Sequence, residues 1–133
     1  MTVYHAGDTL YRSNDFGSSW TKLGTPSFTG TISHATIAEN NTDIIVVARS
    51  ENIEKSVDGG NTFVDIQGSL PNSSITDVAF DPNDDNVIVV TYGTHQNNSQ
   101  KVFLTTDQGV SWQNISYNLN DMPIRSVVID HTD

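Results

Sequence analysis

Three aspartates of this sequence recur in the same local context, and their spacing raises the question of what chemistry they serve. Asp15 lies in RSNDFGSSW, Asp58 in KSVDGGNTF and Asp107 in LTTDQGVSW. Carboxylates placed so regularly could act in acid–base catalysis, or they could accept hydrogen bonds from the amides of their own turn. A glycine follows each aspartate at the second position and supplies the positive φ that tight turns need. The phrase therefore predicts a structural hairpin turn rather than a catalytic group.

The other residues of the phrase support this interpretation. A serine or threonine stands two residues before each aspartate, and another, four residues after it, opens the next strand with a hydroxyl that bonds locally. A large aromatic ring follows, and we expect it to pack beneath its own sheet and hold the turn. The predicted structural set is Ser13, Asp15, Gly17, Ser19, Trp20, Ser56, Asp58, Gly60, Thr62, Phe63, Thr105, Asp107, Gly109, Ser111 and Trp112.

The turn belongs to a longer repeat. The three aspartates are 43 and 49 residues apart, and residues 32–50 align with 75–93 at the same spacing of 43 without a gap. The six extra residues of the longer period fall in the polar loop 93–100. Isoleucine–valine runs, alternating patterns and frequent turns indicate β-strands, and repeats of 40–50 residues are typical of propellers, solenoids or arrays.

Each repeat has room for four short strands, so we predict an all-β chain that forms a β-propeller of four-stranded antiparallel blades. The predicted parts are a partial blade over 1–23, complete blades over 32–66 and 75–116, and the first strand of the next or closing blade over 124–133. Together they make three blades' worth, whereas natural propellers have four to eight blades. Two hypotheses follow: a homodimer that closes a six-bladed ring, or a part of a longer propeller.

The three turns resemble Asp-boxes, also called BNR repeats. The segment VAFDPNDDNVIVVTYG, at 78–93, also resembles the first two strands of such blades. Asp-boxes recur in sialidases, in xyloglucan-cleaving propeller hydrolases and in sortilin-type receptor domains. The resemblance implies a propeller fold, boxes on the outer rim away from the active face, and a secreted bacterial protein that is extracellular or periplasmic. The N-terminus itself has no signal-peptide pattern.

Composition excludes several partners and cofactors. The chain has 16 acidic and 6 basic residues and a net charge of −10, which argues against nucleic acid and anionic membranes as partners. It has no cysteine, so thiol catalysis and thiolate metal sites are excluded. Its histidines show no metal-ligand spacing, and no phosphate-binding loop is present. We therefore predict no metal and no cofactor.

Ligands of propellers normally meet the loops at one end of the blades. The residues of those loops and nearby strand ends that could bind a sugar or polar polymer are Tyr92, His95, Gln96, Asn97, Asn98, Asp77 and Asp121. Two carboxylates across a scissile bond would make a glycosidase. However, His34 and Ser126 stand at the repeat positions that correspond to Asp77, so the carboxylate is no requirement of the repeat. No catalytic residue is predicted.

The sequence thus favours a non-catalytic binding or scaffold module with a glycan or another polymer as ligand. One alternative is a fragment of a sialidase- or xyloglucanase-like glycoside hydrolase. The arginines of this chain are Arg12, Arg49 and Arg125. They belong to different strands and do not form the arginine cluster that a sialidase needs. A second alternative is a sortilin-like peptide-binding propeller. The lack of cysteines argues against it, because those receptor domains usually depend on disulfides.

Overall fold

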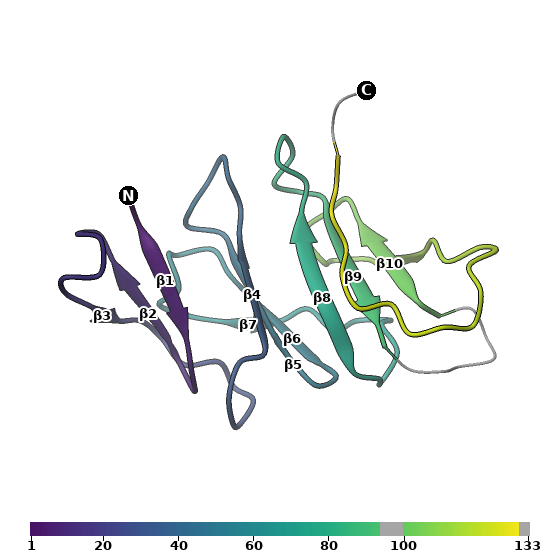
Figure 1. Cartoon of the computed structure of the whole chain (residues 1–133), viewed down its shortest axis with the longest axis horizontal. Coiled ribbons are helices and arrows are strands. Elements are labelled where there is room, and N and C mark those ends of the chain that lie inside the picture. Colours follow the sequence, from purple (N-terminus) through teal and green to yellow (C-terminus); the bar gives the residue numbers. More distant parts are fainter. Residues whose placement is uncertain (94–99, 131–133) are drawn as a thin grey trace.

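The computed structural model describes residues 1–93 and 100–130. Within them, three antiparallel sheets stand side by side in chain order (Figure 1). The first blade contains β1 (Val3–Ala6), β2 (Leu10–Ser13) and β3 (Thr21–Lys22). The second contains β4 (His34–Ile37), β5 (Ile45–Arg49), β6 (Asn52–Ser56) and β7 (Val64–Asp65). The third contains β8 (Ile75–Phe80), β9 (Ile88–Tyr92), β10 (Val102–Thr105) and β11 (Gln113–Asn114).

Within each blade, every strand pairs with the next along the chain, as in a meander. In the second blade Val46 of β5 lies opposite Thr36 of β4 and Lys55 of β6, and Val89 of β9 has the same place in the third blade, opposite Ala79 and Leu104. The outermost strands contain only two residues each, which leaves little unpaired backbone at the exposed edge of each sheet. The all-β class and the propeller blades predicted from the repeat are confirmed.

The core lies between the blades, not within them. Because side chains of a strand alternate between its two faces, Ile45 and Val47 of β5 pack with Leu10 of the first blade, whereas Val46 and Ala48 pack against the third. These four of the five residues of β5 are completely buried. This two-sided burial explains why the sequence here is a continuous apolar run instead of an alternating pattern.

A repeated backbone hydrogen bond marks where the chain enters each new blade. The amide of Ile32 donates to the carbonyl of Gly7 at 2.9 Å, and the amide of Ile75 donates to that of Ser50 at 2.8 Å. The amide of Ile124 donates to the carbonyl of Tyr92 at 3.2 Å. Residues 124–130, which we call the closing segment, therefore leave the third blade as β4 and β8 leave the blades before them.

The closing segment nevertheless forms no strand, although the sequence predicts one there. The first strand of a blade forms its ladder hydrogen bonds with the second strand of the same blade. The described residues end at 130 and include no second strand after the closing segment. The segment instead runs alongside β8 (Figure 1), where Thr76 Oγ1 donates to the carbonyl of Ile124 at 2.6 Å. Its side chains still alternate, since Val127 and Ile129 are half-buried and Val128 is exposed.

Truncation of an inter-blade side chain tests this packing. Phe80 of β8 is 8% exposed and belongs to the cluster that joins the second and third blades. We expect Phe80→Ala to lower the free energy of unfolding by about 3–5 kcal/mol, measured by urea denaturation. Val64→Ala, on a side chain of β7 that is 65% exposed, is the control and should change it by about 0.5 kcal/mol or less. Equal losses would contradict a core located between blades.

Candidate functional site

The aspartate of each repeated turn is held by hydrogen bonds from its own hairpin. Asp58 Oδ1 accepts from the Ser56 hydroxyl at 2.8 Å and from the Thr62 amide at 2.9 Å, and Oδ2 accepts from the Thr62 hydroxyl at 2.6 Å. Ser56 Oγ in turn accepts from the Gly60 amide at 2.8 Å. One carboxylate and one hydroxyl thus satisfy the polar groups of a turn that has no ladder of its own.

The other two turns have the same geometry. Asp15 accepts from the Ser19 hydroxyl at 2.6 Å and from the Ser13 hydroxyl at 2.7 Å. Asp107 accepts from the hydroxyls of Ser111 and Thr105, both at 2.6 Å. These bonds lower the pKa of all three aspartates to about 2, and the hydroxyl four residues downstream is the largest cause. Carboxylates held so firmly in the ionised form are poor proton donors, so they serve structure and not acid catalysis.

The glycine of the turn meets two constraints at once. Gly109 has a φ of +87°, and a Cβ there would lie 2.9 Å from Ile66 Cδ1 of the preceding blade. Gly60 has the same φ and would place a Cβ 2.9 Å from Leu23 Cδ1. The turn therefore needs glycine both for its left-handed backbone and for close contact between blades.

The aromatic ring of the turn corrects one prediction. Trp112 does not only pack beneath its own sheet, because its Nε1 donates to the carbonyl of Ile66 in the preceding blade at 2.9 Å. Trp112 is 9% exposed, whereas Trp20, which has no preceding blade among the described residues, is 43% exposed. The ring is an inter-blade contact, and a single sequence repeat could not show which neighbour it reaches.

Two of the predicted ligand-face residues are used within the structure. Tyr92 is completely buried and packs edge-on against Phe103, with ring centroids 5.7 Å apart, so it is a core residue in this structure. The sequence suggested otherwise because Tyr92 ends β9 beside a polar loop. Asp121 Oδ1 forms an ion pair with Lys101 Nζ at 2.7 Å, and the side chain of Lys101 is fully buried. His95, Gln96, Asn97 and Asn98 lie outside the described residues.

Asp77 is part of a polar row that the repeat brings together. His34, Asp77 and Ser126 stand at equivalent positions of β4, β8 and the closing segment, and we call them the inner row. Asp77 Oδ2 accepts from the Ser126 hydroxyl at 2.9 Å and from the Val127 amide at 3.0 Å. His34 Nδ1 lies 4.0 Å from Asp77 Oδ1, and both side chains are 28% exposed. Three successive blade positions thus present polar groups at one height.

The inner row does not form a nucleophilic triad. A serine nucleophile must donate its proton to a histidine, which a carboxylate then orients. Here Ser126 donates to the carboxylate itself, and Asp77 lies between the other two side chains. The arrangement can donate and accept hydrogen bonds to a ligand but supplies no activated nucleophile.

A buried glutamate holds the connector between the first two blades, and the sequence prediction missed it. Glu54 of β6 is 3% exposed, and its carboxylate accepts from the amide of Ser27 at 3.0 Å and from the Ser27 hydroxyl. Arg49 donates to the carbonyl of Thr29 in the same connector. The signal was available, because the repeat positions that correspond to Glu54 contain Tyr11 and Phe103. The clamp fixes a loop at the end of the blades where ligands were predicted.

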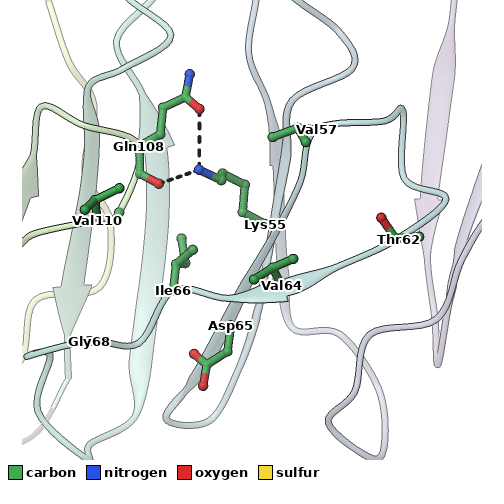
Figure 2. Close-up of a pocket in the computed structure, with 10 residues that line it drawn as sticks. Lys55, Val57, Thr62, Val64, Asp65, Ile66, Gly68, Gln108 and Val110 are labelled. Atoms are coloured by element: carbon green, nitrogen blue, oxygen red, sulfur yellow. Dashed lines mark hydrogen bonds between the residues drawn. The ribbon is translucent and has the colours of Figure 1, made fainter.

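A groove of about 500 Å³ lies between the second and third blades. Figure 2 shows Lys55 crossing it, with Nζ donating to the Gln108 carbonyl at 2.8 Å and lying 3.4 Å from Gln108 Oε1. Burial lowers the pKa of Lys55, and the charge of Asp107 opposes that shift. Val57, Val64 and Val110 line the groove and are largely exposed. Because the ammonium group of Lys55 is already hydrogen-bonded to Gln108 of the third blade, we regard the groove as part of the interface between the two blades.

Comparison with known proteins assigns the chain to a family. The family model named Sortilin-Vps10, described as "Sortilin, neurotensin receptor 3", matches residues 8–127. The chain belongs to the Sortilin-Vps10 family. The predicted resemblance to Asp-box propellers is thereby confirmed. No curated protein matches the sequence significantly.

Solved structures similar to this family member are propellers. An ancestral GH74 enzyme is 24% identical over 93% of this chain and 18% of its own, with a TM-score of 0.71. The GH74 xyloglucanase from Xanthomonas campestris is 15% identical over 86% and 21%, with a TM-score of 0.68. YCF48 bound to D1 peptide is 17% identical over 79% and 33%, with a TM-score of 0.57. The chain thus spans a third or less of these structures, and the likeness establishes the fold.

No group of three or more potential metal ligands occurs in residues 1–93 and 100–130. The same residues contain no helix long and apolar enough to cross a membrane.

Removal of the turn hydroxyl tests the structural role of the Asp-box. Ser56 is 1% exposed, and Ser56→Ala leaves the Gly60 amide without its acceptor and removes one of the donors to Asp58. We expect a loss of about 1–3 kcal/mol in the free energy of unfolding. Ser56→Thr is the matched control, because Thr105 does the same work in the third turn. A neutral alanine variant would show that the turn does not depend on this hydroxyl.

The lowered pKa values predict acid sensitivity. Each Asp-box aspartate has a folded-state pKa of about 2 against a usual value of 3.8, so acid favours the unfolded state. Their stabilisation is complete above about pH 4 and is lost as the pH falls toward 2. Urea denaturation between pH 2 and 6 should show this slope, and Asp15→Asn, Asp58→Asn and Asp107→Asn should each reduce it. An unchanged slope in these variants would show that the turns do not cause the acid sensitivity.

Proposed function

We propose that this chain is a non-catalytic binding module that contacts a polar polymer, such as a glycan, through the inner row. The observation that supports this is the convergence of His34, Asp77 and Ser126 from three successive blades. Their side chains offer a carboxylate acceptor, a hydroxyl and an imidazole that donates or accepts. A polymer with many hydroxyl groups can bond to such a row along its length.

The contacts of the Asp77 and Asp121 carboxylates argue against glycoside hydrolysis as the activity. A glycosidase needs one carboxyl group as acid and another as base or nucleophile. Asp77 already accepts bonds from Ser126 and Val127, and Asp121 is paired with Lys101. Neither is a free catalytic group, so binding without turnover is the better proposal.

A neutral glycan is the ligand class that fits best. The net charge of −10 disfavours anionic polymers, and one similar structure is named a xyloglucanase. We further propose that the module works outside the cell or in the periplasm, as its Asp-box repeats suggest. A basic peptide is the second candidate, because YCF48 was solved with a bound peptide and the acidic surface would attract a basic segment.

Binding to soluble xyloglucan, measured by calorimetry, tests the proposal. His34→Ala should weaken binding about tenfold, the loss expected for one net hydrogen bond. Gln113→Ala, on the exposed outermost strand β11, is the control and should bind like the native chain. Reducing ends should not accumulate during prolonged incubation. Release of reducing ends would establish hydrolysis instead, and equal affinities of the two variants would remove the inner row from the site.

A further inference from the structure

The first blade has a slot where its own first strand should lie. A cavity of about 490 Å³ separates β1 from β4, and its walls include Val3, Tyr4 and Ala6 of β1, Leu10 of β2, and Ala35 and Ile37 of β4. In the second and third blades the corresponding place is filled by β4 and β8, which pair with β5 and β9. The slot therefore has the walls of a first-strand site but no strand.

The side chains around the slot show what it lacks. Val78 and Phe80 of β8 face the second blade and are 7% and 8% exposed. Their equivalents in β4, Ala35 and Ile37, face the slot, and neither is fully buried. An extended segment with apolar residues on one face would cover them as β4 covers Val78 and Phe80.

The closing segment has the form that the slot requires. It is extended, it belongs to no strand, and its half-buried residues Val127 and Ile129 are the repeat equivalents of Val78 and Phe80. Its entry bond, from the Ile124 amide to the Tyr92 carbonyl, resembles those that precede β4 and β8, with the acceptor one residue earlier in the repeat. The slot and the closing segment lie at opposite ends of the row of blades (Figure 1), so one chain does not bring them together.

We propose that the closing segment of one copy fills the slot of a second copy and becomes the first strand of its first blade. The pairing of Thr36 with Val46 and of Ala35 with Val47 sets the register. Tyr4 pairs with Arg12 as Val46 pairs with Lys55, so Val128 of one copy then lies opposite Tyr4 of its partner, and Val127 lies opposite His5. Each copy has one slot and one closing segment, so two copies complete a ring of six blades, within the range of natural propellers.

An independent contact on the rim supports a second copy as the occupant. Trp112 is buried because Ile66, just after β7 of the preceding blade, accepts its indole N–H. Trp20 is 43% exposed, and the residue just after β11 of the third blade is Ile115, the equivalent of Ile66. In the proposed ring the third blade of one copy precedes the first blade of the other. The carbonyl of Ile115 then accepts from Trp20, so the same chain supplies both missing partners.

Disulfide trapping tests the register directly, since the native chain has no cysteine. The double variant Tyr4→Cys, Val128→Cys should form a covalent dimer under mild oxidation, seen on a non-reducing gel. The control Val57→Cys, Val128→Cys places exposed thiols away from the slot and should not cross-link efficiently. A cross-linked single chain would overturn the proposal, because it would show that the three blades close on themselves.

Mass in solution and tryptophan emission test the interface without a cross-link. Light scattering across a dilution series should give a particle near twice 14.5 kDa. Val128→Asp, on a side chain that is 87% exposed in the single chain, would bury a charge in the slot and should weaken the dimer at least about 100-fold. Val57→Asn is the control, because Asn14 occupies the same position in the first repeat.

Trp20 provides a local readout. In a Trp112→Phe background, which copies Phe63 of the second repeat, the emission of Trp20 should shift to shorter wavelength as the dimer forms. A folded monomer at every concentration, with Trp20 emission unchanged, would overturn the proposal. It would assign the slot to blades outside these residues.

Discussion

Each blade of this chain is apolar on both faces of its sheet, and the rest of the structure depends on that constraint. A sheet with two apolar faces is stable only between two neighbours, because exposure of either face costs hydrophobic free energy. The second blade satisfies this condition, and the first four residues of its strand β5 are completely buried. Within residues 1–93 and 100–130, the first and third blades each satisfy it on one side only. The slot beside β1 and the exposed indole of Trp20 are consequences of the missing neighbour.

The Asp-boxes allow these sheets to remain small. The hairpin between the third and fourth strands of a blade leads to an outer strand of two residues, which is too short to hold the turn by ladder bonds alone. A carboxylate and two hydroxyls replace the ladder, and the following ring reaches the next blade, as Trp112 does. The most regular carboxylates of the sequence are thereby committed to folding, and any binding function must use other residues.

Those other residues occur where the repeat is broken. Positions that face a neighbouring blade are similar in all copies, because they meet the same packing demand. The inner row differs at every copy, with His34, Asp77 and Ser126 at one repeat position. Glu54 likewise replaces an aromatic residue to hold a connector. A packing role alone would keep the same kind of residue at these positions in every repeat. Their divergence is therefore consistent with a binding role for these side chains.

The sequence by itself determined the fold class, the meander of four strands and the geometry of the Asp-box. These follow from local causes: alternation of side chains, turn chemistry and a repeat that copies them. It did not determine which blade a side chain would reach. Tyr92 belongs to a strand end that the sequence placed at the ligand face, yet neighbouring strands bury it. The contacts of Trp112 with Ile66 and of Asp77 with Ser126 join residues about 46 and 49 positions apart. Only the packing of one blade on the next decides such contacts, because they depend on the angle and distance between sheets and not on any local pattern.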